Sequence, residues 1–215
     1  MNELRRDYFL ERWVIISTER AKRPNDFMDN KAVGEQRGQG CGRESLKAVD
    51  DCSFCAGNEG KTPPSKASYF NYSPRPQCKA DVAGKPWAGW NVRVIPNLFP
   101  AVEPGEARAM GETDISASGF HEVIVESPIH GRHPQFMSDA EIKLLFTVYR
   151  DRFKAISEAP EARFISLFRN YGKEAGASLS HAHSQLISLP IVPTVISEQF
   201  GLDYTKVIES ETQGP

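Results

Sequence analysis

The sequence has few cysteines, almost no excess of charge and no long apolar run. Its 215 residues include 4 cysteines, and 26 basic side chains against 28 acidic ones give a formal net charge of −2. This balance argues against nucleic acid or a membrane as a partner. No apolar run approaches the roughly 20 residues that span a bilayer, and the charged N-terminus lacks the apolar core of a signal peptide. We therefore expect a cytoplasmic protein whose cysteines are thiols or metal ligands rather than disulfides.

The most informative stretch covers residues 170–189, which begin with a turn containing two glycines and continue as an alternating run. Residues two apart on a strand face the same side, so His181, His183 and Gln185 should form one polar row. Such groups are unfavourable in a core unless they have partners. The row is therefore either a functional site or the exposed side of an edge strand. The glycine turn and the cysteines described below favour a site.

The rest of the chain predicts an α+β fold, with an antiparallel sheet and one long helix packed on it. Segments 13–16, 90–95, 120–126 and 163–168 read as strands. Ser138 and Glu141 form a capping box that starts a helix, and a second helix is expected over 196–209. Apolar residues recur along the long helix at helical spacing, namely Ile142, Leu145, Phe146, Tyr149, Phe153 and Ile156. No linker divides the chain, so we expect residues 1–215 to form a single domain.

Two long polar stretches surround Cys52-Ser53-Phe54-Cys55, and loops of that length usually need something to hold them. Thiols at this spacing either grip one metal ion or form a redox motif, but the strand-to-helix setting of a redox motif is missing here. A zinc ribbon with Cys41 and Cys78 would lack a second close pair. From the residues alone, His130 and His133 compete as a third ligand.

The segment Gly176-Ala177-Ser178-Leu179-Ser180-His181-Ala182-His183-Ser184-Gln185 resembles the active-site strand of the galactose-1-phosphate uridylyltransferase family, a branch of the histidine-triad superfamily. It also resembles the strand of the related plant-type ADP-glucose phosphorylases. The uridylyltransferases usually have His-Pro-His where this chain carries Ala182 in the middle. The resemblance implies a histidine-triad-like fold equivalent to the N-terminal half of the family's usual length. It also implies a homodimer.

The resemblance further implies a closed, structural zinc site. Family members that keep the zinc use the cysteine pair, a histidine in a Ser-Pro-x-His segment and the first histidine of the active-site strand. The corresponding residues here are Cys52, Cys55, His130 and His181. We interpret His121 and His133 as an ordinary strand histidine and an ordinary loop histidine.

With His181 assigned to zinc, His183 is free to attack the α-phosphorus of a nucleotide sugar, giving a nucleotidyl-histidine and a sugar 1-phosphate. Gln185 can donate hydrogen bonds to a phosphoryl oxygen but cannot pass a proton, which favours transfer to a phosphate acceptor over hydrolysis. The resemblance implies that Arg20, Arg23 and Asn170 lie near the substrate phosphates and that Asn97 lies beside the nucleotide. Without the resemblance, Arg20 and Arg23 would read as a solvated basic turn. Ser178 and the backbone N–H groups of 172–176 are expected to complete a phosphate cradle.

The first functional interpretation is a nucleotidyltransferase that acts on UDP-glucose and a hexose 1-phosphate. The alternative is a phosphorylase, in which inorganic phosphate accepts the nucleotidyl group from ADP-glucose or a dinucleoside polyphosphate. Ala182 and residues 177–180 lean toward the alternative. A third interpretation, from another class, is a zinc-held nucleotide-binding module without turnover.

Overall fold

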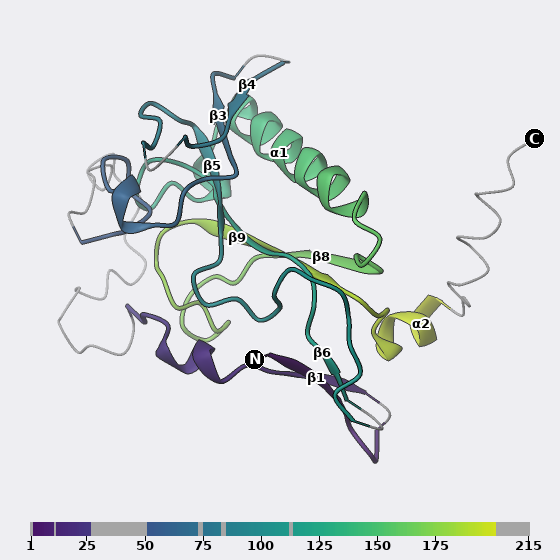
Figure 1. Cartoon of the computed structure of the whole chain (residues 1–215). Helices are drawn as coiled ribbons and strands as arrows, with labels where there is room; N and C mark the ends of the chain where they lie inside the picture. The colour runs from purple at the N-terminus through teal and green to yellow at the C-terminus, as the bar shows by residue number, and fades with distance from the viewer. Residues whose placement is uncertain are drawn as a thin grey trace, which may run out of the picture.

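The computed structural model describes residues 2–10, 12–26, 51–72, 75–82, 85–111 and 114–200. In Figure 1 the long helix α1 lies across the strands of the larger sheet, and the N-terminal strands form a smaller sheet at the opposite side. The strands are β1 (Glu3–Arg6), β2 (Trp13–Ile16), β3 (Ala67–Phe70), β4 (Gln77–Lys79), β5 (Val92–Pro96), β6 (Asp114–Ser116), β7 (His121–Val125), β8 (Phe164–Phe168) and β9 (His183–Leu189). The helices are α1 (Asp139–Ser157) and α2 (Thr194–Phe200), with 3-10 turns η1 (Thr18–Lys22), η3 (Glu59–Lys61) and η4 (Pro134–Phe136).

The six-stranded sheet has the order β4-β3-β5-β7-β9-β8, and the three-stranded sheet has the order β2-β1-β6. All the pairings between these strands are antiparallel. The α+β fold expected from the sequence is confirmed. Strand β9 lies between β7 and β8 and is buried along its whole length. The interpretation of this stretch as an exposed edge strand is therefore wrong.

Helix α1 begins with the expected capping box, in which the Ser138 and Glu141 side chains each accept from the other's backbone N–H. Its buried stripe differs from the expected one and consists of Leu144, Leu145, Val148 and Ile156. Phe146 and Phe153 are 64% and 46% exposed, so their assignment to the stripe was wrong. The stripe follows residues four apart and includes Arg152, whose guanidinium pairs with the buried Glu122 carboxylate at 2.7 Å. The sequence prediction used only the spacing of apolar residues, so it could not recognise a buried stripe that includes an arginine.

Side chains on the central strands alternate between the two faces of the sheet, so the core residues lie on one face and the candidate site residues on the other. On the face toward α1, Ile124 of β7 and Leu186 of β9 pack in one core cluster with the helix residues. On the opposite face, Val123 of β7 packs against Phe54 of the cysteine loop, and His183 and Gln185 of β9 line a pocket. The histidine and the glutamine therefore face away from the helix.

A close backbone approach fixes the start of β7 against β9. Gly119 has a φ of +146°, and a Cβ at this position would lie 2.2 Å from the Ser188 carbonyl oxygen. Only glycine fits there. The Phe120 N–H donates to the Ser188 hydroxyl at 2.8 Å, and this bond helps to hold the register of the two strands.

Several sequence expectations fall at or beyond the edge of the described residues. The second helix, α2, ends at Phe200, and the remainder of 196–209 lies outside the described part of the chain. Cys41 also lies outside it. In the described part, no helix is both long enough and apolar enough to cross a membrane.

Candidate active site and metal centre

The two cysteines meet two histidines at the end of the large sheet. The ligand atoms of Cys52, Cys55, His130 and His181 all lie within 4.8 Å of one another. The Nδ1 atom of His181 is 3.5 Å from the Cys52 sulfur and 3.6 Å from the Cys55 sulfur. Sulfur and nitrogen bound to one zinc ion at about 2.3 and 2.0 Å in a tetrahedron would be about 3.5 Å apart. The donor set and its spacing fit a metal ion.

Hydrogen bonds and burial around the cluster orient these side chains as metal ligands. His181 Nε2 lies 2.9 Å from the Ser127 carbonyl, to which it donates, so that Nδ1 presents its lone pair to the sulfurs. Burial raises the pKa of the Cys52 thiol to about 11, so a thiolate there needs an adjacent cation. The Ala56 N–H donates to the Pro128 carbonyl and ties the cysteine loop to the segment that carries His130. The sequence expectation and the geometry therefore select the same four residues.

His133 lies apart from this group. Its ring meets Tyr171 edge-on, with ring centroids 4.9 Å apart, and its Nδ1 accepts from Arg169 at 2.8 Å. Burial and the neighbouring Arg169 lower the pKa of His133 to about 4. The structure thus decides the competition left open by the sequence in favour of His130.

One ring nitrogen of His183 is held by the backbone. Its Nδ1 lies 2.8 Å from the His181 carbonyl oxygen, which can only accept, so Nδ1 carries the proton and Nε2 carries the lone pair. Burial lowers the pKa of His183, so the ring stays neutral at neutral pH. Phe54, which stands between the two cysteines, meets the His183 ring edge-on with centroids 5.5 Å apart. The metal loop therefore supports the ring of His183.

A first pocket opens beside His183. Its walls come from segments far apart in the sequence and include most of the expected substrate residues, namely Arg20, Arg23, Asn97, Ser178, His183 and Gln185. Leu98 and Phe99 add an apolar side. The Arg20 guanidinium donates to the Phe99 carbonyl at 2.9 Å, which ties η1 to the turn after β5.

A second pocket is also lined by His183 and includes Asn170, Tyr171 and Arg169. The Arg169 Nε is 3.1 Å from each oxygen of the buried Glu126 carboxylate. The Glu126 carboxylate also accepts from Tyr149 and from Ser184 of β9. Sequence reasoning missed Arg169 because its partner Glu126, which directly follows β7, is 43 positions away in the sequence.

The expected phosphate cradle in residues 172–176 is wrong for one of its N–H groups. The Gly176 N–H donates to the Lys173 carbonyl at 2.9 Å, so this group closes the turn and does not face a ligand. Gly172 and Gly176 have φ values of 76° and 77°, which glycine adopts without strain. These glycines shape the turn that leads to Ser178 and β9.

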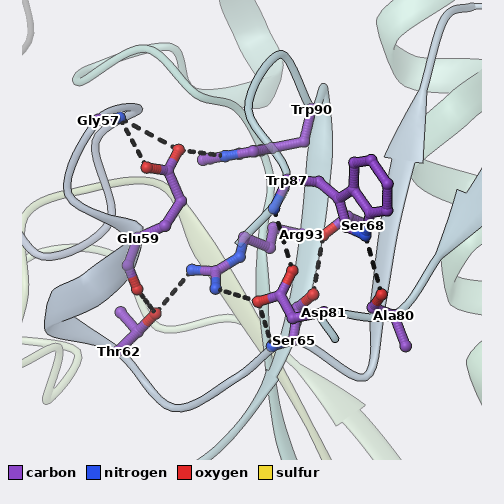
Figure 2. Close-up of polar contacts among 10 residues, drawn as sticks. All are labelled: Gly57, Glu59, Thr62, Ser65, Ser68, Ala80, Asp81, Trp87, Trp90 and Arg93. Carbon is purple, nitrogen blue, oxygen red and sulfur yellow. Dashed lines mark hydrogen bonds and ion pairs between the residues drawn. The ribbon is translucent and has the colours of Figure 1, made fainter. Parts of the chain in front are cut away.

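The segment after the cysteine loop forms one wall of the first pocket, and hydrogen bonds to Arg93 hold it in place. Figure 2 shows the Arg93 guanidinium of β5 between Thr62 and the Asp81 carboxylate. Arg93 donates to the Thr62 hydroxyl at 2.6 Å and to Asp81 at 2.8 Å. Glu59 accepts from the Trp90 indole at 2.7 Å. These bonds hold the loop that carries Thr62, a pocket residue, without any contribution from the metal ligands.

No family model matches the sequence. Among curated proteins, the chain is 32% identical over 216 residues to an ADP-glucose phosphorylase of Arabidopsis thaliana, covering 98% of this chain and 54% of the relative. It is 26% identical over 202 residues to a galactose-1-phosphate uridylyltransferase of Thermotoga maritima, covering 94% and 51%. A crystal structure of an Arabidopsis thaliana ADP-glucose phosphorylase with bound ADP-glucose has a TM-score of 0.56 at 32% identity, covering 99% of this chain and 56% of that one. The chain belongs to the superfamily of galactose-1-phosphate uridylyltransferases and histidine-triad proteins.

The resemblance inferred from residues 176–185 is therefore confirmed at the level of this superfamily. The chain spans about half the length of the curated superfamily relatives that it matches. Of the two relatives, the phosphorylase shares more residues with the chain than the uridylyltransferase does. The sequence alone had put the uridylyltransferase first.

Proposed function

We propose that this chain transfers a nucleotidyl group from a nucleotide sugar to a phosphate oxygen through a covalent bond to His183. The observation that carries the proposal is the position of this ring. It lines both pockets and is held by the His181 carbonyl with Nε2 unprotonated. A neutral imidazole is a competent nucleophile without a separate base.

In the first half of the reaction, Nε2 of His183 attacks the α-phosphorus, and the phosphorus–oxygen bond to the sugar phosphate breaks. The bonding electrons leave with the sugar phosphate, which requires no proton from the enzyme because phosphate is a weak base. The Nδ1 proton stays on the ring, where the bond to the His181 carbonyl stabilises the developing positive charge. In the second half, an acceptor phosphate oxygen attacks, and the phosphorus–nitrogen bond breaks with its electrons returning to Nε2.

The two pockets suit the two halves of the substrate. The first pocket combines an apolar side with the arginines Arg20 and Arg23, as a nucleotide with a charged phosphate requires. The second pocket supplies Arg169 and Asn170 for the sugar phosphate and for the phosphate that replaces it. Gln185 lies in the first pocket and donates to the transferred phosphoryl group.

Inorganic phosphate is our preferred acceptor, which makes the chain an ADP-glucose phosphorylase type of enzyme. Support comes from the relative with 32% identity and from the similar structure that binds ADP-glucose. The second candidate is UDP-glucose:hexose-1-phosphate uridylyltransferase, supported by the relative with 26% identity over 94% of the chain.

The metal centre has a structural part in this proposal. Cys52, Cys55, His130 and His181 would hold zinc, which these sulfur and nitrogen donors favour. Bound there, zinc would fill its coordination with protein ligands and cross-link the cysteine loop to the start of β9.

We also propose that residues 1–215 act as one domain in a homodimer. Limited proteolysis and analytical ultracentrifugation would test these two points.

The decisive experiment is covalent labelling with ADP-glucose and UDP-glucose carrying ³²P at the α-phosphate. We expect acid-labile, alkali-stable label on the wild type and none on His183→Ala. Calorimetry with ADP-glucose should show that the variant still binds. Adding inorganic phosphate or hexose 1-phosphate then identifies the acceptor by which one removes the label. Tight binding of both nucleotide sugars with no label on the wild type would instead support the binding module without turnover.

A further inference from the structure

The hydrogen bonds around the Gln185 amide have fixed directions, because they can be traced back to backbone N–H groups. The Ala101 N–H donates to His121 Nδ1 at 3.0 Å. A backbone N–H can only donate, so Nδ1 must hold a lone pair. A neutral imidazole carries one N–H, and in His121 it is therefore on Nε2.

His121 is neutral at physiological pH. Burial is the main cause that lowers its pKa to about 4, and the nearby Arg20 acts in the same direction. The residue is only 6% exposed. Its tautomer is thus fixed by the fold and does not change with pH near neutrality.

The Nε2–H of His121 points to Gln185, whose Oε1 lies 2.9 Å away. A second donor reaches the same oxygen. The Phe99 N–H occupies Asn97 Oδ1 at 2.9 Å, so the Asn97 amide turns its Nδ2 toward Gln185 Oε1, at 3.4 Å. The two donor nitrogens, Asn97 Nδ2 and His121 Nε2, are 3.2 Å apart because they converge on one acceptor. With its oxygen held this way, the Gln185 amide directs its NH2 group away from His121.

We propose that His121 is a positioning residue that locks the Gln185 side chain with its NH2 group toward the first pocket. The lock makes Gln185 a hydrogen-bond donor to the phosphoryl group that His183 attacks. The flipped amide would present its carbonyl oxygen to an anionic phosphoryl group and repel it. The effect of the lock on nucleotidyl transfer rests on the proposed function. The orientation of Gln185 itself is a property of the folded chain.

Two substitutions separate the lock from simple packing. In His121→Asn, the shorter amide can still accept from the Ala101 N–H but cannot reach Gln185. In His121→Gln, the longer amide can place an N–H where Nε2 stands and donate to Gln185 Oε1. We expect His121→Asn to slow the nucleotidylation of His183 by about tenfold to a hundredfold, with the Kd for ADP-glucose nearly unchanged, since a donor to the transferred group is lost. His121→Gln should recover most of that rate.

A double substitution tests whether the effect passes through Gln185. In a Gln185→Ala background, adding His121→Asn should lower the labelling rate by less than about twofold, because no amide remains to be oriented. Equal rates for His121→Asn and His121→Gln, or a full additional loss in the Gln185→Ala background, would overturn the proposal.

A spectroscopic readout does not depend on turnover. With ¹⁵N-labelled histidine, the His121 ring of the wild type should show a protonated Nε2 and an unprotonated Nδ1 from pH 6 to 8. His121→Asn assigns this ring by removing its signals, and His121→Gln provides a second assignment if the first variant does not fold. A His121 ring protonated on Nδ1 would refute the lock. If the wild type forms no nucleotidyl-enzyme but shows the expected tautomer, the proposed function fails and the lock stands.

Discussion

The ion pair between Arg93 and Asp81 allows a quantitative test of how the wall of the first pocket is held. The two side chains are 3% and 2% exposed, and their charged atoms are 2.8 Å apart. In the described part of the chain, Arg93 Nε has no hydrogen-bond partner. Among the described residues, Asp81→Ala would therefore leave the buried guanidinium with the Thr62 hydroxyl as its remaining hydrogen-bond partner.

Breaking a buried pair in this way destabilises a protein by about 3–5 kcal/mol. For a chain of this length, each kcal/mol lowers the melting temperature by about 2–4 °C, so we expect a fall of about 10 °C. Asp81 also accepts from the Ser65 N–H at 2.7 Å, and the loss of this bond adds to the effect. Thermal unfolding followed by circular dichroism, with urea unfolding as a second measurement, would give both quantities.

A matched control is Asp151→Ala. Asp151 is 36% exposed and pairs with the exposed Arg150, so its removal should change stability by about 0–1 kcal/mol. Combining Asp81→Ala with Arg93→Met removes both buried charges and should recover part of the loss. If Asp81→Ala were no more destabilising than Asp151→Ala, the account of this anchor would be refuted.

The same pair predicts a dependence of stability on pH. Burial alone would raise the pKa of Asp81, but bonds from the Ser65 N–H and the Arg93 guanidinium outweigh it and lower the pKa below 3.8. A lowered carboxyl pKa contributes stability that is complete above the unfolded-state value and is lost as the pH falls through the folded-state value. The stability difference between wild type and Asp81→Ala should therefore be constant near neutral pH and shrink below about pH 4.

Three further substitutions address the metal and the transfer chemistry. Cys52→Ser should lose zinc and melt at a lower temperature. The control Cys78→Ser, a substitution on β4, should keep the zinc content and the melting temperature of the wild type. Elemental analysis that finds full zinc in Cys52→Ser would contradict the proposed centre. Gln185→His should raise the rate of nucleotide release to water by about a hundredfold, because a third histidine can relay a proton, and an unchanged ratio of hydrolysis to phosphorolysis would exclude the role given to the amide. Arg169→Gln should raise the KM for the phosphate acceptor and the concentration of ADP-glucose needed to label His183, because the second pocket is assigned to both phosphates; normal values of both would show that Arg169 does not bind them.

Local patterns in the sequence predicted the parts of the site that lie close together along the chain. The alternation in 181–185 gave the face shared by His183 and Gln185, and Ser138 with Glu141 gave the start of α1. The metal residues came from the resemblance, since spacing alone could not choose between His130 and His133. The short strands β1 and β6 were not predicted, because they mix charged or polar residues with a single apolar one, unlike the equally short but wholly apolar β2.

The missed residues all depend on partners brought together by strand register. His121 and Gln185 are 64 positions apart, and their contact exists because β7 and β9 pair with Val123 opposite Gln185. Arg169 and Glu126 are separated by 43 positions. Taken alone, His121 is indistinguishable from an ordinary strand histidine. Its tautomer depends on the Ala101 N–H, which no sequence pattern marks.

The order of the strands in the large sheet has a consequence for how the site assembles. Strands β3, β4, β5 and β7 precede α1, whereas β8 and β9 follow it, so the sheet closes along a seam between β7 and β9. Until the seam forms, β7 presents an unpaired edge of the kind that promotes association between chains. Three of the four metal-ligand candidates, Cys52, Cys55 and His130, precede α1 in the sequence, and His181 follows it. A metal ion held by all four therefore fastens the late strands to the early ones, and it joins them beside the nucleophile.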